Sequence, residues 1–229
     1  MALYAIGDLH LSFSESKPMD IFGENWNDYE NKIKKNWLEK ISDEDTILIP
    51  GDISWAIKFS GAMIDLEWID KLPGKKIIIK GNHDYWWTSL KKMIGKFETI
   101  DFLHNKYFVY KDYAICGSRG WNSPSKTNFT ESDLKIYKRE IIRLKISLDS
   151  AIKDGYSKFI VMMHYPPTND LKETSEFTSL FEKYGVEKVI YGHLHTEASF
   201  FSSIQGDVNG VEYILVSSDY LKFDPKKVL

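Results

Sequence analysis

Short runs rich in β-branched residues recur along this 229-residue chain, and most of them end abruptly in a polar or glycine cluster. Short continuous apolar runs are typical of strands that are buried on both faces. Such strands are predicted at Leu3–Ile6, Thr46–Ile49, Lys76–Ile79, Tyr113–Cys116, Lys158–Met163, Lys188–Tyr191 and Glu212–Val216. This pattern restricts the chain to folds in which a sheet is covered on both faces.

Helical patterns separate several of these strands. The four-residue spacing of Ile33, Trp37 and Ile41 predicts a helix over Asn27–Ile41. Further helices are predicted at Met63–Leu72, which stops before Pro73-Gly74, at Thr88–Phe97 and at Glu131–Asp154. Because strands and helices alternate in the first half, the sequence predicts parallel βαβ units and an α/β fold.

The second half mixes strands with a predicted hairpin. Strands are expected at Thr99–Leu103 and Lys106–Tyr110, and a hairpin at Phe200–Val216 that turns at Asn209-Gly210. No linker interrupts the sequence, so a single domain over residues 1–229 is expected. Two long loops, 11–25 and 121–130, are interpreted either as lids over a site or as ordinary surface insertions.

Composition argues against several classes of protein. The chain has 30 basic and 33 acidic residues, a net charge of −3, which disfavours a nucleic-acid binder. Cys116 is the single cysteine, which rules out an internal disulfide or a thiolate metal cluster. No apolar run is long enough for a transmembrane helix, and the first residues lack a basic leader. A cytoplasmic protein that does not engage membranes is expected.

The histidines follow the predicted strands. Five of the six stand just after a strand, accompanied by aspartate and asparagine. The clusters are Asp8 with His10, Asp52, Asn82 with His83 and Asp84, His164, and His193 with His195. A lone histidine is usually a core or surface group, but five ordered clusters fit that interpretation poorly. Parallel strands deliver their carboxyl ends to one edge of a sheet, so these groups are expected to converge.

The types of these side chains indicate which metal ions they would bind. Imidazole nitrogen and carboxylate oxygen without sulfur suit divalent manganese, iron, zinc, cobalt or nickel. There are more candidate ligands than one four-coordinate ion can use, and they suit two ions that share a carboxylate. The sequence therefore predicts two divalent metal ions, with manganese, iron or zinc expected and the native pair left open.

The order Asp-x-His, Gly-Asp, Gly-Asn-His-Asp, a strand-end His and Gly-His-x-His resembles the motif series of the calcineurin-like metallophosphoesterases. The resemblance runs from Asp8 to His195. It implies a four-layer α/β/β/α sandwich with mixed sheets and the metal site at the C-terminal ends of the strands. It further implies that Asp8, His10 and His195 bind a first metal. Asn82, His164 and His193 would bind a second, with Asp52 bridging the two.

Two residues of the Gly-Asn-His-Asp motif are predicted to take part in catalysis. The resemblance implies that His83 protonates the leaving oxygen or stabilises charge on the phosphate, while Asp84 orients its ring. A metal-bridging hydroxide would attack the phosphorus in line. The expected activity is hydrolysis of a phosphomonoester or a phosphodiester.

The sequence departs from the protein serine/threonine phosphatases of this superfamily. Those enzymes extend Gly-Asp with Val-Asp-Arg-Gly, whereas Ile53, Ser54 and Trp55 follow Asp52 here. Lys80 stands where they place Arg. A small-molecule phosphoester is therefore the expected substrate; its identity and the oligomeric state stay open. Two alternatives remain: a nuclease, which the charge balance disfavours, and a non-enzymatic metal-binding scaffold, which the complete motif set disfavours.

Two residues outside the ligand set are candidates for substrate binding. Arg119 follows a strand end, where its guanidinium is suited to phosphate oxygens, although a plain surface role is also consistent with its position. Trp86 belongs to a group of aromatic residues near the motifs and is the preferred candidate for stacking on a substrate. Core packing is the alternative for these aromatic residues.

Overall fold

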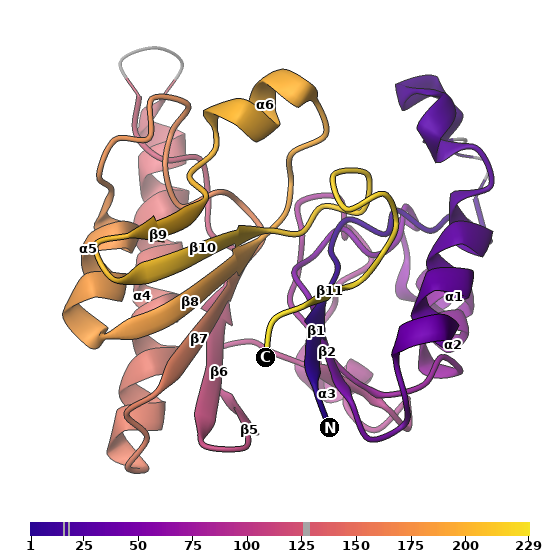
Figure 1. Ribbon diagram of the computed structural model, residues 1–229, viewed down its shortest axis with the longest axis horizontal. Helices are drawn as coiled ribbons and strands as arrows, with labels where there is room; N and C mark the ends of the chain where they lie inside the picture. Colours follow the sequence, from indigo (N-terminus) through magenta and orange to yellow (C-terminus); the bar gives the residue numbers. More distant parts are fainter. Residues whose placement is uncertain (16, 18, 126–128) are drawn as a thin grey trace. The chain divides into compact units, whose positions relative to one another are not determined.

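The computed structural model describes residues 1–15, 17, 19–125 and 129–229. The chain forms two compact units: unit 1 comprises Met1–Phe102 and Val216–Leu229, and unit 2 comprises Leu103–Leu215. Each unit contains one mixed sheet with helices packed beside it (Figure 1). The predicted α/β class, with two mixed sheets flanked by helices, is confirmed.

The sheet of unit 1 has the strand order β11-β1-β2-β3-β4. Its strands are β1 (Leu3–Ala5), β2 (Thr46–Ile49), β3 (Lys75–Ile78), β4 (Ile100–Phe102) and β11 (Lys226–Lys227). β1 to β4 are parallel, and β11 pairs antiparallel with β1. α1 (Tyr29–Lys40) joins β1 to β2 and α2 (Phe59–Asp70) joins β2 to β3, which confirms the predicted βαβ units.

The helices of unit 1 follow the predicted pattern with shifted ends. α1 buries Tyr29, Ile33 and Trp37 at four-residue spacing. α2 begins at Phe59, before the predicted Met63. The sequence carries no signal for this start, because Lys58 at the N-cap makes no side-chain cap. α3 covers only Leu90–Met93, since Gly95 follows with a φ of 75° that no helix accommodates.

The sheet of unit 2 has the strand order β5-β6-β7-β8-β10-β9. Its strands are β5 (Phe108–Tyr110), β6 (Tyr113–Ser118), β7 (Phe159–Met163), β8 (Val186–Tyr191), β9 (Gly206–Val208) and β10 (Val211–Leu215). The four central strands are parallel, and the two edge strands are antiparallel to their neighbours. α4 (Glu131–Lys153) starts at a capping box between Thr130 and Asp133.

Two helices of unit 2 were not predicted. α5 (Glu176–Tyr184) is capped by Ser175 and ends at Gly185 in the left-handed region, so both of its end signals are present in the sequence. α6 (Glu197–Ser202) occupies the first part of the predicted 200–216 hairpin, which is therefore wrong at its start. The hairpin begins at β9, and its predicted turn is confirmed by φ values of 52° at Asn209 and 81° at Gly210.

The two long loops are only partly described. Residues 16 and 18 of the 11–25 loop and residues 126–128 of the 121–130 loop lie outside the described residues. The first loop contains two short 3₁₀ helices, η1 (Met19–Phe22) and η2 (Glu24–Trp26). A role for either loop as a lid stays a prediction. None of the helices in the described ranges is both long and apolar enough to cross a membrane.

Candidate functional site

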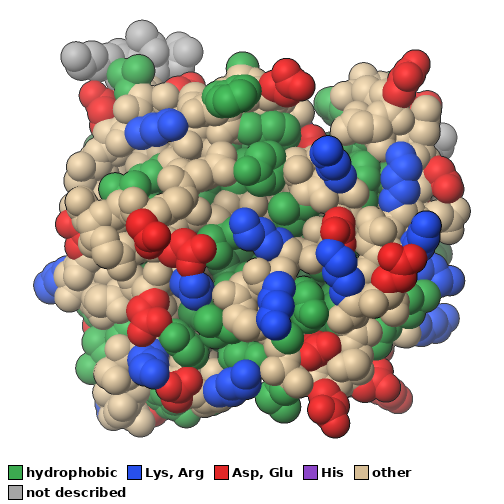
Figure 2. Space-filling model, viewed as in Figure 1, with side chains coloured by type: hydrophobic (Ala, Val, Ile, Leu, Met, Phe, Trp, Pro, Cys, Tyr) green, Lys and Arg blue, Asp and Glu red, His purple; other side chains and the backbone are tan. Residues whose placement is uncertain are grey.

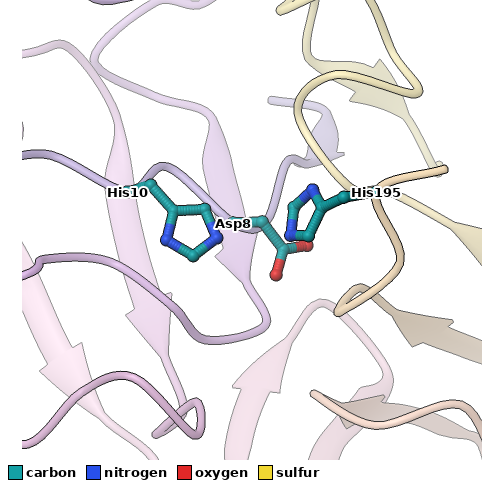
Figure 3. Close-up of side chains that lie close together, drawn as sticks. All are labelled: Asp8, His10 and His195. Carbon is teal, nitrogen blue, oxygen red and sulfur yellow. The ribbon is translucent and has the colours of Figure 1, made fainter. Parts of the chain in front are cut away.

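In unit 1, two of the sequence motifs lie at the carboxyl ends of β1 and β2. The strands run in register, with Ala5 opposite Leu48. The loops after β1 and β2 are also hydrogen-bonded to each other. The N–H of Asp8 donates to the Gly51 carbonyl (3.0 Å), and the N–H of His10 donates to the Asp52 carbonyl (2.9 Å). Asp8 and His10 both project from the loop after β1 (Figure 3). Backbone pairing therefore brings Asp8, His10 and Asp52 together.

The backbone is unusual at these positions. Asp8, His10 and Asp52 have φ values of 54°, 47° and 50°, and His193 of unit 2 has 74°. Positive φ is uncommon outside glycine, although Asp and His tolerate it better than most residues. Backbone of this kind costs on the order of 1 kcal/mol per residue and clusters at ligand-binding sites. Four of the seven predicted metal ligands share it.

The Asp52 carboxylate connects two motifs of unit 1. Its Oδ2 lies 3.8 Å from Nε2 of His10, and its Oδ1 accepts the backbone N–H of His83 at 2.8 Å. Asp8, Asp52 and Asp84 are each 0–1% exposed. Burying carboxylates is costly unless they are paired, hydrogen-bonded or bound to a metal. This concentration of buried acceptor oxygens beside an imidazole fits a site for divalent cations.

The Asp84 carboxylate connects the loops after β2 and β3. Its Oδ2 accepts the N–H groups of Asp52 (3.0 Å) and Gly81 (2.7 Å). Its Oδ1 accepts from Ile53 (2.9 Å), Ser54 (3.3 Å) and the indole of Trp86 (2.9 Å). These contacts tie the loop after β2 to the loop after β3. That this carboxylate also orients the His83 ring stays a prediction. Burial and the Asp52 carboxylate raise the pKa of Asp84 to about 7, and the N–H donors act in the opposite direction.

The position of Gly81 explains why the Gly-Asn-His-Asp motif begins with glycine. A Cβ at this position would lie 2.1 Å from both the backbone nitrogen and the Oδ1 of Asp52. Any side chain would displace the loop that carries Asp52. The glycine therefore permits the close approach of two loops.

Two tryptophans of unit 1, Trp86 and Trp55, have different surroundings in the structure. Trp86 is 2% exposed and packs in the core, where its N–H binds Asp84. Its predicted stacking on substrate stays a prediction that this placement does not favour. Trp55 instead stacks on the His10 ring, with centroids 4.9 Å apart and planes at 24°, and lies 4.5 Å from the His83 ring. The sequence hinted at Trp55 only through its place three residues after Asp52.

In unit 2, His164 and His193 lie at the ends of the neighbouring parallel strands β7 and β8. The N–H of His164 donates to the Arg119 carbonyl (3.0 Å), and the His164 carbonyl accepts the N–H of Gly192 (3.2 Å). Nδ1 of His193 lies 3.2 Å from Nε2 of His164. Two imidazole ligands of one metal ion, each at 2.0–2.1 Å, lie about 3.0–3.4 Å apart. The pair is therefore suited to share a cation.

The remaining ligand candidates lie in loops. Asn82 is half-buried in the loop after β3, between Gly81 and His83. His195 is half-buried in the loop between β8 and α6, and Figure 3 labels it. His104, which we assigned no function, lies in the loop between β4 and β5.

Arg119 follows β6, as predicted. Its guanidinium lies over the Trp121 ring at 4.7 Å, and burial lowers its pKa. Among the described residues, its buried Nε has no hydrogen-bond partner. The contact with His164 runs through the Arg119 carbonyl and not through the side chain. A role as phosphate clamp stays a prediction.

Sequence comparison finds a family match and a short local match to one curated protein. Residues 1–197 match the family model described as calcineurin-like phosphoesterase. A stretch of 77 residues is 31% identical to the Gene 66 protein of Mycobacterium phage L5. That alignment covers 34% of this chain and 37% of the phage protein, so it spans well under half of either.

Two solved structures share the fold. A protein of unknown function, AQ665 from Aquifex aeolicus, aligns over 99% of this chain and 95% of its own, with a TM-score of 0.50 and 18% identity. The phosphopantetheinyl hydrolase PptH from Mycobacterium tuberculosis aligns over 100% and 95%, with a TM-score of 0.51 and 16% identity. At these identities the likeness concerns the fold.

Proposed function

Because the chain belongs to the calcineurin-like phosphoesterase family, we propose that it is a metal-dependent phosphohydrolase that cleaves a small-molecule phosphomonoester or phosphodiester. The observation that carries this proposal is the Asp52 carboxylate, which is buried between the imidazole of His10 and the backbone of His83. In this position the carboxylate would bind a metal ion next to the His10 imidazole and hold the backbone of His83, the proposed proton donor, beside it.

The proposed ligands fall into two sets. Asp8, His10 and His195 would hold one divalent ion. Asn82, His164 and His193 would hold the second, and Asp52 would contact both. The donors are carboxylates, imidazoles and one amide, a set that suits manganese, iron or zinc. When bound, the two ions would supply Lewis acidity and activate water for attack.

The chain's own residues would complete the reaction. His83 stands on the loop fixed by Asp52 and Asp84, and it would donate a proton to the leaving oxygen as the P–O bond breaks. Asp84 would hold that loop through its N–H contacts, and Trp55 would keep the His10 ring in place. One water is consumed. A monoester yields an alcohol and inorganic phosphate, and a diester yields an alcohol and a phosphomonoester.

A nuclease is the less favoured alternative. Lysine and arginine side chains alternate with aspartate and glutamate on the face drawn in Figure 2, without an extended basic stretch. A nucleic-acid binder usually concentrates its basic residues on one face. The net charge of −3 also disfavours a nuclease.

We propose that the protein is cytoplasmic and makes no contact with membranes. Cell fractionation would check this location.

The experiment is a substrate panel on metal-restored protein. The chain is treated with a chelator, reloaded with Mn²⁺, Fe²⁺ or Zn²⁺, and assayed on phosphomonoesters, phosphodiesters and nucleotides. The name of the M. tuberculosis neighbour adds a phosphopantetheinyl ester to the panel. Hydrolysis that needs the metal and is lost in Asp52→Asn is expected. Bound metal near two ions per chain without hydrolysis of any ester would support the scaffold alternative.

A further inference from the structure

A row of stacked side chains in unit 2 ends at His193, a proposed metal ligand. The Tyr165 ring lies against the His193 ring, with centroids 4.2 Å apart and planes at 38°. Tyr165 also contacts the Trp121 ring, at 4.9 Å and 48°. The Arg119 guanidinium lies over the Trp121 ring at 4.7 Å. We call Arg119, Trp121 and Tyr165 the support stack.

Tyr165 contacts both imidazoles of the proposed ligand pair. Its ring meets the His164 ring nearly at a right angle, with centroids 5.3 Å apart and planes at 84°. Tyr165 is 5% exposed, and a close-packed interior leaves a ring of this size little room to move. The orientation of His164 and His193 toward each other therefore depends on the Tyr165 ring.

The backbone fixes the place of Tyr165. The Arg119 carbonyl accepts the N–H groups of both His164 and Tyr165, each at 3.0 Å. Pro166 follows directly, and a proline restricts the residue before it to extended backbone. The support stack and the ligand His164 therefore share one backbone anchor, the carbonyl of Arg119.

Trp121 is fixed by a different element. Its indole N–H donates to Oδ1 of Asp133 at 2.9 Å. Asp133 forms the capping box of α4 together with Thr130, so the indole is attached to the start of a long helix. The guanidinium of Arg119 over the ring adds a cation–π attraction. The support stack thus connects the N-terminus of α4 to the histidines at the ends of β7 and β8.

Such a stack favours the metal-bound state for two physical reasons. Ligands that are already oriented lose less conformational entropy when the ion binds. An imidazole bound to a divalent ion also becomes electron-poor, and the electron-rich face of an aromatic ring attracts positive charge. Groups behind a metal ligand commonly set its orientation and its affinity.

We propose that the support stack positions His164 and His193 for the divalent ion that they share, and that Tyr165 is the residue on which the affinity for this ion depends. The inference rests on the proposed function, because it takes the ligand roles of the two histidines from there. It also gives Arg119 a role that needs no contact with the substrate.

The first test titrates Mn²⁺ into chelator-treated protein and follows the heat of binding. Tyr165→Leu should weaken one of the two proposed ions about 10- to 100-fold, the usual loss when a group behind a metal ligand is removed. Tyr165→Phe should keep the affinity, since the ring remains. Trp121→Leu should weaken the same ion about 2- to 10-fold, which corresponds to the loss of one aromatic pair.

A double substitution tests whether Tyr165 acts through its histidine neighbour. In a His193→Ala background the Tyr165 ring has lost the ligand that it positions. Adding Tyr165→Leu to that background should therefore weaken Mn²⁺ binding much less than it does in the unaltered protein. A ring that only stabilises the fold would have the same effect in both backgrounds.

The control is a buried tyrosine of the same unit that packs elsewhere. Tyr213 on β10 is 3% exposed and contacts Phe181 at 6.2 Å. Tyr213→Leu removes a ring of the same size and should weaken neither ion. NMR of the metal-free protein with labelled histidine gives a second measurement. The His193 ring signals should move in Tyr165→Leu, because the ring current of the tyrosine is lost, and should stay in place in Tyr213→Leu.

The outcomes separate this inference from the proposed function. If the unaltered protein hydrolyses no ester but Tyr165→Leu weakens Mn²⁺ binding as expected, the proposed function fails and the positioning role holds. Absence of Mn²⁺ binding in the unaltered protein would overturn both. Unchanged affinity in Tyr165→Leu, or an equal loss in Tyr165→Phe, would overturn the inference alone. Should Tyr165→Leu not fold, Trp121→Leu at a half-buried position decides the question by the same titration.

Discussion

The proposed ligands at the strand ends of unit 1 and those at the strand ends of unit 2 lie in different kinds of surroundings. In unit 1, Asp8, His10 and Asp52 are almost fully buried and are held by backbone hydrogen bonds between loops. In unit 2, His164 is buried, but His193 and His195 are half-buried, and His193 also lines a pocket.

This difference indicates a division of roles. Unit 1 fixes its groups by loop-to-loop contacts around Asp84 and Gly81, which suits groups whose geometry must not vary. Unit 2 combines two histidines with space for an organic group. Substitutions in the loops of unit 1 should therefore impair catalysis on every substrate.

The largest effect is expected from Gly81→Ala. The added Cβ would have to displace the Asp52 loop, because it would lie 2.1 Å from Asp52 atoms. We expect turnover to fall by ~10,000-fold, about 100-fold from misplaced geometry and about 100-fold from weakened metal binding. Metal content and kcat/KM are the measurements. Gly95→Ala is the control for an added methyl group without a clash: its φ of 75° disfavours alanine and should lower stability, but no atom lies within 4 Å of its Cβ, so activity should stay. Full activity in Gly81→Ala would contradict the close-approach argument.

A smaller loss is expected from His83→Ala. This change removes the proposed proton donor but none of the proposed ligands, so metal content should stay the same. Turnover should fall about 100- to 1,000-fold, the usual contribution of a general acid. His104→Ala, outside the motifs, should behave as the unaltered protein. Unchanged turnover in His83→Ala would remove this residue from the mechanism.

Asp84→Asn tests the positioning role of that carboxylate. The amide would turn an NH₂ group toward N–H groups that now donate to oxygen. We expect a loss of about 2–4 kcal/mol in the free energy of unfolding and about 10- to 100-fold in activity. The matched change Asp101→Asn removes an exposed ion pair with Lys75 and should cost less than about 1 kcal/mol. Equal stability of the two variants would argue against the role.

The smallest effect is expected at the amino-terminal end of β2, away from the proposed ligands of unit 1. Asp45 precedes β2 and accepts hydrogen bonds from the N–H of Ser42 (2.9 Å) and of Ala2 (2.6 Å). These bonds, that from Ser42 first, lower the pKa of Asp45 from 3.8 to about 2. Asp45→Asn should cost about 1–2 kcal/mol of unfolding free energy near neutral pH and leave activity unchanged.

The pH dependence of this effect has a definite sign. Because the pKa of Asp45 is lower in the folded chain, its stabilisation is complete above about pH 4 and is lost as the pH falls toward 2. The difference in stability between the unaltered protein and Asp45→Asn should shrink over that range in urea titrations. A difference that stays constant down to pH 2 would show that the charge contributes nothing.

Much of the fold could be predicted because its signals are local. The strands ending before Asp8, Asp52 and His164 are short apolar runs whose limits shifted by only a residue or two. α5 was missed although Ser175 and Gly185 mark its ends, because its nine residues carry too short a hydrophobic pattern. The predicted Phe200–Val216 hairpin starts too early, because the Thr196 cap begins a helix that runs to Ser202.

The sequence by itself determined the types and order of the proposed metal ligands, because they follow strands whose pattern is local. Only the tertiary structure decided that Asp84 binds the loop after β2 and that Trp55 and not Trp86 contacts His10. These contacts join residues far apart in the chain, for example 32 positions between Asp52 and Asp84. They depend on strand register and on the close approach of loops, which no local pattern encodes.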